Sequence, residues 1–165
     1  MKIIVVSDSH GRNDLLSDLV NQHPDADAFL HCGDIEDEAD SFPEYLIVQG
    51  NNDYCNDTPA QRVLPFGSHR ILLVHSHQFS YRRREEQMIE LAKKYGCDII
   101  CFGHTHVADY RKVHGFVLLN PGSLKYSRDG RLPSYAILQI DGDQVDAEIV
   151  FLEPKKSKRG FFFHR

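Results

Sequence analysis

Five short apolar runs in this 165-residue chain each end directly in a polar cluster, and no other feature limits the fold as much. These runs predict strands over residues 2–7, 28–32, 45–49, 70–75 and 98–102. Between them, the helical spacing of apolar residues predicts helices over 13–22 and 85–95, the second ended by Gly96. Alternating strands and helices indicate a sheet that is at least partly parallel and covered by helices.

The pattern changes after Gly103, where no helix is expected. Turn residues such as His114-Gly115 and Asp129-Gly130 separate further predicted strands over 107–113, 116–120, 135–140 and 145–152. We therefore predict an α/β fold in which two mixed β-sheets pack as a sandwich with flanking helices. Residues 1–154 are expected to form a single domain, followed by a basic, Phe-containing C-terminal tail over 155–165.

Charge and composition exclude several classes of protein. The net charge is −5, but the tail carries five basic and no acidic side chains, so residues 1–154 carry −10. Residues 1–154 therefore lack the positive charge that binds a phosphate backbone, and nucleic acid is not expected as a partner. The short apolar runs predict no membrane segment and no signal peptide, so we expect a cytoplasmic protein. The four cysteines lack CxxC spacing and are expected to be reduced thiols, with a structural zinc site as the weaker alternative.

The polar clusters that end the first five strands predict a metal site. They are Asp8-x-His10, Gly33-Asp34, Gly50-Asn51-Asn52-Asp53, His75-Ser76-His77 and Gly103-His104-x-His106. Ligands bind at the carboxyl ends of strands in open α/β sheets, and residues two apart in extended chain face the same side. A mixed set of imidazole, carboxylate and amide donors suits Mn²⁺, Fe²⁺, Co²⁺, Ni²⁺ or Zn²⁺. By composition, Gly-Asn-x-Asp and Gly-His-x-His are each expected only ~0.04 times, so their joint presence argues against chance.

This ordered series of motifs resembles the calcineurin-like metallophosphoesterase superfamily. The short length, Asn52 and the segment Asn120-Pro121-Gly122-Ser123 before Arg128 resemble its small prokaryotic YfcE-type phosphodiesterase branch. The resemblance implies a four-layer α/β-β/α fold and two divalent ions, Mn²⁺ first, with Ni²⁺, Co²⁺, Fe²⁺ and Zn²⁺ as alternatives. It implies one metal bound by Asp8, His10 and His106, a second by Asn51, His75 and His104, and Asp34 bridging the two. The implied reaction is hydrolysis, in which a hydroxide shared by the two metals attacks phosphorus.

We count Asp34, Asn52, Asp53 and His77 as candidate catalytic residues. Many members of the superfamily have His where Asn52 stands, and an Asn donates a hydrogen bond but cannot act as a general acid. His77 and Arg12 are the nearest alternative donors. Asp53 lies just outside the ligand set, where it is expected to orient a ligand or anchor the loop.

The expected function is hydrolysis of a small phosphodiester. A phosphomonoesterase and a non-catalytic scaffold, like the retromer subunit that resembles this family, are the alternatives, and a nuclease is the weakest of the hypotheses.

Several local interpretations stay open. Residues 82–84, three consecutive arginines, are either a solvated helix start or a substrate-steering group, and Arg128 either contacts substrate phosphate or forms a salt bridge. The Phe-rich tail could dock on a second copy of the chain, so a homo-oligomer is one of the open alternatives. Four histidines are expected to face solvent: His23, His69, His114 and His164.

Overall fold

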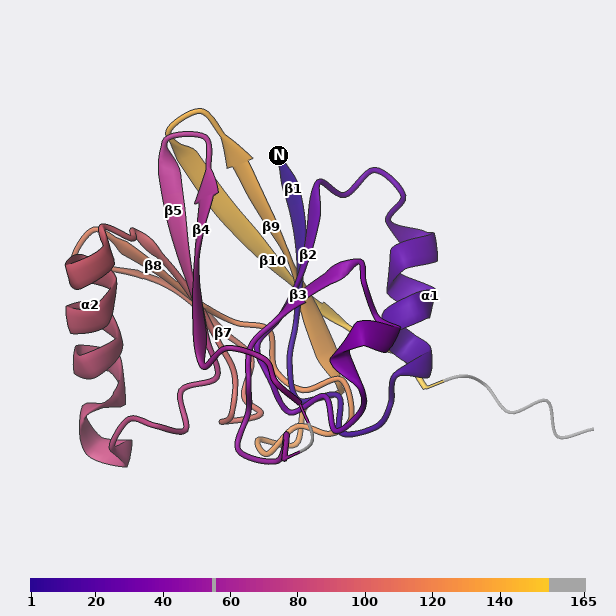
Figure 1. Cartoon of the computed structure of the whole chain (residues 1–165). Helices are drawn as coiled ribbons and strands as arrows, with labels where there is room; N and C mark the ends of the chain where they lie inside the picture. The colour runs from indigo at the N-terminus through magenta and orange to yellow at the C-terminus, as the bar shows by residue number, and fades with distance from the viewer. Residues whose placement is uncertain (55, 155–165) are drawn as a thin grey trace, which may run out of the picture.

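A computed structural model describes residues 1–54 and 56–154 of the chain (Figure 1). Its described strands form two five-stranded sheets. In the first sheet the order is β10 (Gln144–Phe151), β9 (Ser134–Asp141), β1 (Lys2–Val6), β2 (Ala28–His31) and β3 (Tyr45–Ile47). In the second sheet it is β4 (Gln61–Phe66), β5 (His69–Val74), β6 (Ile99–Phe102), β8 (Phe116–Asn120) and β7 (Asp109–Val113).

Both sheets are mixed. In the first, β1, β2 and β3 run parallel, whereas β9 pairs antiparallel with both β1 and β10. In the second, β5, β6 and β8 run parallel, and the edge strands β4 and β7 are antiparallel to their neighbours. The parallel strands of each sheet present their carboxyl ends at one end of the molecule, which is where side chains that follow them can meet.

The helices cover the outer faces, α1 (Asp14–Gln22) on the first sheet and α2 (Arg84–Tyr95) on the second (Figure 1). Two short 3₁₀ helices lie in loops, η1 (Ala39–Ser41) and η2 (Tyr81–Arg83). Because successive side chains of a strand face opposite sides, Ile3 and Val5 of β1 enter the core between the sheets, while Ile4 and Val6 pack toward α1. A strand buried on both faces is a continuous apolar run. The predicted four-layer sandwich is confirmed.

Most predicted elements are present, with one strand missed. The sequence analysis did not predict β4, and the strand expected over 107–113 begins at Asp109. No helix follows Gly103 in the described part of the chain, as expected. Cys32, Cys97 and Cys101 are buried free thiols, whereas Cys55 and the tail over 155–165 lie outside the described residues. None of the described helices is both long and apolar enough to cross a membrane.

Candidate metal centre

The loops that follow five strands bring the predicted site residues to one end of the molecule. Three of these loops follow β1, β2 and β3 of the first sheet, and two follow β5 and β6 of the second. They gather at the lower end of the view in Figure 1. The candidate site therefore lies across the junction of the two sheets, and neither sheet forms it alone.

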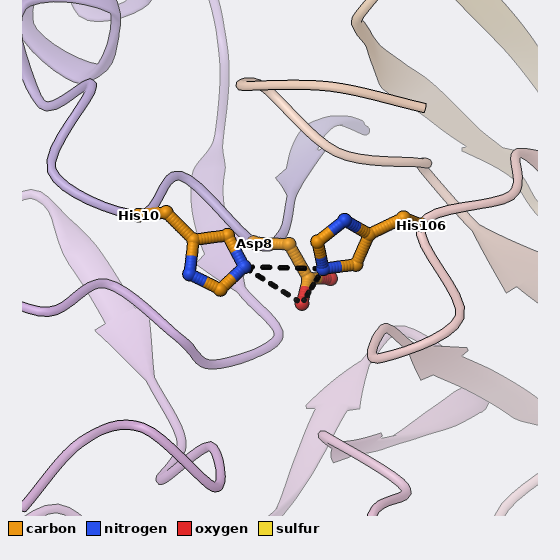
Figure 2. A group of neighbouring side chains, drawn as sticks. All are labelled: Asp8, His10 and His106. Carbon is orange, nitrogen blue, oxygen red and sulfur yellow. Dashed lines mark hydrogen bonds and ion pairs between the residues drawn. The ribbon is translucent and has the colours of Figure 1, made fainter. Parts of the chain in front are cut away.

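Asp8, His10 and His106 form the first group of candidate ligands (Figure 2). The Nε2 atom of His106 lies 3.1 Å from Oδ1 of Asp8 and 3.1 Å from Nε2 of His10, which is itself 3.8 Å from the same carboxylate oxygen. That oxygen is buried and, within the described part of the chain, accepts no hydrogen bond. A buried acceptor facing two imidazole nitrogens is the arrangement expected of a cation site.

The other polar atoms of Asp8 are held in place. Its Oδ2 accepts hydrogen bonds from Oγ of Ser7 (2.6 Å) and the backbone N–H of His104 (3.0 Å), and Oγ of Ser123 donates to its carbonyl oxygen (2.8 Å). Burial opposes ionisation of this carboxyl group, but the adjacent imidazoles of His106 and His75 outweigh it, so the pKa of Asp8 lies below its ordinary value. Asp8 is thus a fixed carboxylate with one oxygen directed into the site.

The second group centres on Asp34 and His75. Nε2 of His75 lies 3.5 Å from Oδ2 of Asp34 and 3.9 Å from Oδ1 of Asp8. Oδ1 of Asn51 lies 3.0 Å from Nε2 of His75 and 2.9 Å from Nδ1 of His104. Because Nδ1 of His75 donates to the carbonyl oxygen of Cys32 (2.7 Å), its Nε2 lone pair is directed into the site.

Asp34 lies between the two groups. Its Oδ2 is 3.8 Å from Nε2 of His10 in the first group and 3.5 Å from Nε2 of His75 in the second. Burial opposes its ionisation, but the nearby imidazole of His75 and the hydrogen bond from the backbone N–H of Asn52 lower its pKa far below the ordinary range. The position and ionisation of Asp34 fit the bridging role that the family resemblance implies.

The backbone around these side chains is strained. Residues other than glycine rarely adopt a positive φ. Of the candidate ligands, five do so: Asp8 (51°), His10 (43°), Asp34 (58°), His104 (71°) and His106 (58°). Such strain concentrates at functional sites, where the surrounding structure maintains it.

Two glycines leave room for the carboxylates. A Cβ atom on Gly103 would collide with Oγ of Ser7 and lie 2.8 Å from Oδ2 of Asp8, and one on Gly50 would collide with the carboxylate of Asp34. Neither position requires a positive φ. Glycine is therefore needed at both positions for space, because the backbone passes directly over the ligand side chains.

Asn52 and Asp53 contact the loop of Asp34 in different ways. Asn52 donates its backbone N–H to Oδ1 of Asp34 (2.8 Å) and its side-chain Nδ2–H to Oδ2 (3.1 Å). Asp53 is buried, and its carboxylate accepts the backbone N–H groups of Asp34 (2.8 Å), Gly50 (2.8 Å) and Glu36 (2.9 Å). These bonds favour an anchoring role for Asp53 over a direct catalytic one.

The remaining predicted residues lie at the margin of the site. His77 is exposed at the residue level, with its ring centroid 5.3 Å from that of His75, and partial desolvation of the ring together with the neighbouring His75 lowers its pKa. Arg12 forms an ion pair with Asp14 (3.1 Å). Arg128 donates to the carbonyl oxygen of His104 (3.2 Å), so its described contact with the site is a hydrogen bond to backbone.

Three further residues contact the first group and were not predicted. Oε1 of Glu36 lies 2.6 Å from Nδ1 of His10, and Nζ of Lys125 donates to the carbonyl oxygen of His10 (3.1 Å). The Tyr126 ring packs edge-on against His106, with the centroids 4.7 Å apart. Glu36 lies two residues beyond the Gly33-Asp34 motif, and this closeness to Asp34 in the sequence does not by itself indicate that it contacts His10.

The donor set fits divalent metal ions. Two carboxylates, four imidazoles and one amide oxygen converge. In two groups the ligand atoms all lie within 4.8 Å of one another, and these groups are Asp8–His10–His106 and Asp8–Asp34–His75. Oxygen and imidazole donors in this proportion suit first-row transition ions better than an oxygen-only ion such as Ca²⁺. Within the described residues, neither group includes a cysteine, so the alternative of a cysteine zinc site receives no support.

Comparison with known proteins places this centre in a family. Residues 1–143 match the calcineurin-like phosphoesterase superfamily domain. The chain is 35% identical over 146 residues to the probable metallophosphoesterase YsnB of Bacillus subtilis, covering 87% of this chain and 86% of YsnB. The crystal structure of a predicted phosphoesterase from Streptococcus pneumoniae superimposes with a TM-score of 0.85 at 29% identity, covering 91% of this chain and 88% of that one.

Two solved structures of lower identity share the fold. One is YfcE, a phosphoesterase from E. coli, with a TM-score of 0.67 and 20% identity over 86% of this chain and 90% of that one. The other is Vps29 of Entamoeba histolytica complexed with Zn²⁺, with a TM-score of 0.71 and 24% identity over 92% of this chain and 99% of that one. The family match over residues 1–143 and the identity to YsnB carry the assignment, in agreement with the motifs and the convergent site. The chain belongs to the calcineurin-like phosphoesterase superfamily.

Proposed function

We propose that this protein is a metal-dependent phosphodiesterase that hydrolyses a small phosphodiester. The observation that carries the proposal is the convergence of two candidate ligand groups on the shared carboxylates Asp8 and Asp34. Two adjacent cation sites with shared ligands are typical of phosphoryl hydrolysis, because both the attacking and the leaving oxygen need charge stabilisation.

Seven side chains would hold two divalent transition ions, of which Mn²⁺ is the first candidate. Asp8, His10 and His106 would hold one ion, Asn51, His75 and His104 the other, and Asp34 both. When bound, the ions supply Lewis-acid charge that attracts the phosphoryl group and lowers the pKa of water. This charge is needed because residues 1–154 carry a net charge of −10.

The residues around the ligands position the reacting groups. Both N–H groups of Asn52 bind the Asp34 carboxylate, which fixes its two oxygens relative to the two ligand groups. His77 lies exposed beside His75, where a ring N–H can donate a hydrogen bond to a substrate oxygen. The buried anchor Asp53 ties the loops of Asp34 and Gly50 together.

The test is hydrolysis of bis(p-nitrophenyl) phosphate by chelator-treated protein, to which Mn²⁺, Ni²⁺, Co²⁺, Fe²⁺ or Zn²⁺ is added in turn. We expect turnover with at least one ion and none in excess EDTA. p-Nitrophenyl phosphate, assayed in parallel, tests the phosphomonoesterase alternative, which a higher kcat/KM for the monoester would support. Metal binding without turnover across a broad panel of phosphoesters would overturn the proposal and favour a scaffold.

Asp34→Asn is the decisive variant, because it keeps the shape of the side chain and removes the charge shared by both groups. We expect turnover to fall at least ~100-fold with the thermal unfolding temperature largely retained. Asp25→Asn is the matched control, since Asp25 is a surface carboxylate paired with Lys2 (2.9 Å), which begins β1, whereas the ligands Asp8 and His10 follow the other end of that strand. Equal turnover by Asp34→Asn and the wild type would contradict the shared-carboxylate arrangement.

A further inference from the structure

A cavity of about 400 Å³ lies beside the loop that carries the candidate ligands His104 and His106. Thr105, between these two histidines, lines the cavity, and so does Asn120, whose Nδ2 donates to Oγ1 of Thr105 (2.9 Å) and to the carbonyl oxygen of Gly103 (3.2 Å). The cavity and the candidate metal centre therefore share one wall. Its volume is within the range that accommodates a small organic molecule or part of one.

Arg84, the first residue of α2, presents an unpaired positive charge to this cavity. Its Nε atom is buried and has no hydrogen-bond partner among the described residues. Its guanidinium packs against the Tyr81 ring, 5.9 Å from the centroid, a contact that leaves the N–H donors unsatisfied. Burial lowers the pKa of Arg84, as expected for a cation that has lost water without gaining a counter-ion.

The other charges of the cavity do not neutralise Arg84. The two acidic side chains that line it, Glu85 and Asp109, are both bound by Arg111, at 2.7 Å and 2.8 Å. Arg82 also lines the cavity and is exposed, so the lining carries a net charge of +1 in a protein whose net charge is −5. This local positive charge selects for an anion.

The rest of the lining is suited to the organic part of a ligand. Met88 and Phe102 are buried side chains, Val107 is half-buried, and the Tyr81 ring is 87% exposed. Apolar walls with one unsatisfied guanidinium are typical of sites that bind a carbon skeleton bearing an anionic group.

We propose that this cavity binds the part of the substrate that does not react, and that it selects phosphodiesters carrying a second anionic group, a carboxylate or a phosphate, which Arg84 binds. A guanidinium pairs with either anion through two parallel N–H bonds, which accounts for its unused donors. The inference rests on the proposed function for the identity of the substrate, and it adds the residue that determines specificity.

The test compares two matched probes, ethyl p-nitrophenyl phosphate and 2-carboxyethyl p-nitrophenyl phosphate. For the wild-type protein with the most effective metal, we expect kcat/KM to be about tenfold higher for the carboxyethyl probe, mainly through a lower KM. In Arg84→Gln this preference should disappear, and in Arg84→Lys it should be reduced but present, since a lysine keeps the charge and loses the planar fork.

Arg83→Gln is the matched control. Arg83 is the neighbouring arginine, but it is exposed and paired with Glu86 (2.8 Å) and Glu90 (3.7 Å), so the preference for the carboxyethyl probe should persist. Thermal unfolding of each variant reports whether the helix start remains folded.

Calorimetric binding of both probes separates this inference from the proposed function. Tighter binding of the carboxyethyl probe that depends on Arg84, without turnover of either probe, would overturn the phosphodiesterase proposal and retain the anion pocket. Equal binding of the two probes by the wild type, or a preference that Arg84→Gln retains, would overturn the anion pocket whether or not the probes are hydrolysed.

Discussion

Nδ1 of His10 lies 2.6 Å from Oε1 of Glu36, and this contact sets the direction of a candidate metal ligand. A carboxylate that accepts the Nδ1 proton leaves the lone pair on Nε2, which faces Asp8 and His106. Glu36 is itself held by the hydrogen bond from its backbone N–H to Oδ1 of Asp53 (2.9 Å). The buried Asp53 therefore supports His10 through Glu36.

Replacing Glu36 with Ala should weaken metal binding without unfolding the protein. The variant keeps the backbone N–H bond to Asp53 but frees the His10 ring, and loss of such a supporting carboxylate typically costs 10–100-fold in metal affinity. Titration of chelator-treated protein with Mn²⁺ by calorimetry measures the change. Glu36→Gln should fall between the wild type and Glu36→Ala, because its amide oxygen still accepts the Nδ1 proton.

The control for this experiment is Glu38→Ala. Glu38 is an exposed acidic residue two positions further on, and its backbone groups, not its side chain, make its described hydrogen bonds. Its replacement should leave Mn²⁺ affinity within about twofold of the wild type. An equal loss of Mn²⁺ affinity in both variants would show that the negative charge near the site, and not the orientation of His10, controls metal binding.

Asp53→Asn should lower the free energy of unfolding by about 1–3 kcal/mol. Three backbone N–H groups donate to this buried carboxylate. The asparagine side chain has an NH₂ group in place of one carboxylate oxygen, and this NH₂ group would face a backbone N–H that needs an acceptor. The cost is that of a buried N–H left without an acceptor. Urea unfolding of chelator-treated protein measures it.

The exposed residue Asp57 provides the comparison, since Asp57→Asn should change the stability by less than about 0.5 kcal/mol. The experiment also separates the two roles considered for Asp53. Unchanged stability together with lost turnover would indicate a direct catalytic role and would contradict the anchoring role that the three hydrogen bonds indicate.

The core strands could be predicted because burial on both faces leaves a local signature. In β1, the alternating pairs Ile3–Val5 and Ile4–Val6 are both apolar, so the run has no polar face. β4 left no such signature. It is an edge strand that pairs only with β5, its side chains are mostly half-buried, and Pro65 interrupts the apolar run.

The candidate ligands could be predicted because each follows the end of an apolar run, whereas their supports depend on contacts between distant segments. The sequence does not show that His10 meets Glu36, 26 residues away. His69 is a similar case. We expected it to face solvent, but its side chain is 11% exposed and pairs with Asp98, because β5 and β6 begin side by side. That expectation was wrong.

The ion pair of His69 predicts a stability that depends on pH. Nδ1 of His69 lies 2.5 Å from Oδ2 of Asp98, and this hydrogen bond raises the pKa of His69 above its ordinary value of about 6.5. Because the folded state binds the proton more tightly than the unfolded state, the stabilisation is complete below about pH 6.5 and is lost as the pH rises through the raised pKa. His69→Gln should therefore be more destabilising at pH 5.5 than at pH 9.

The measurement is the difference in free energy of unfolding between the wild type and His69→Gln, taken at both pH values with chelator present so that metal binding does not contribute. Subtracting the variant removes the titration of groups common to both proteins. His114→Gln, at an exposed histidine in the turn between β7 and β8, should show no such dependence. A destabilisation by His69→Gln that is equal at the two pH values, or larger at pH 9, would show that the charge of His69 does not stabilise the fold.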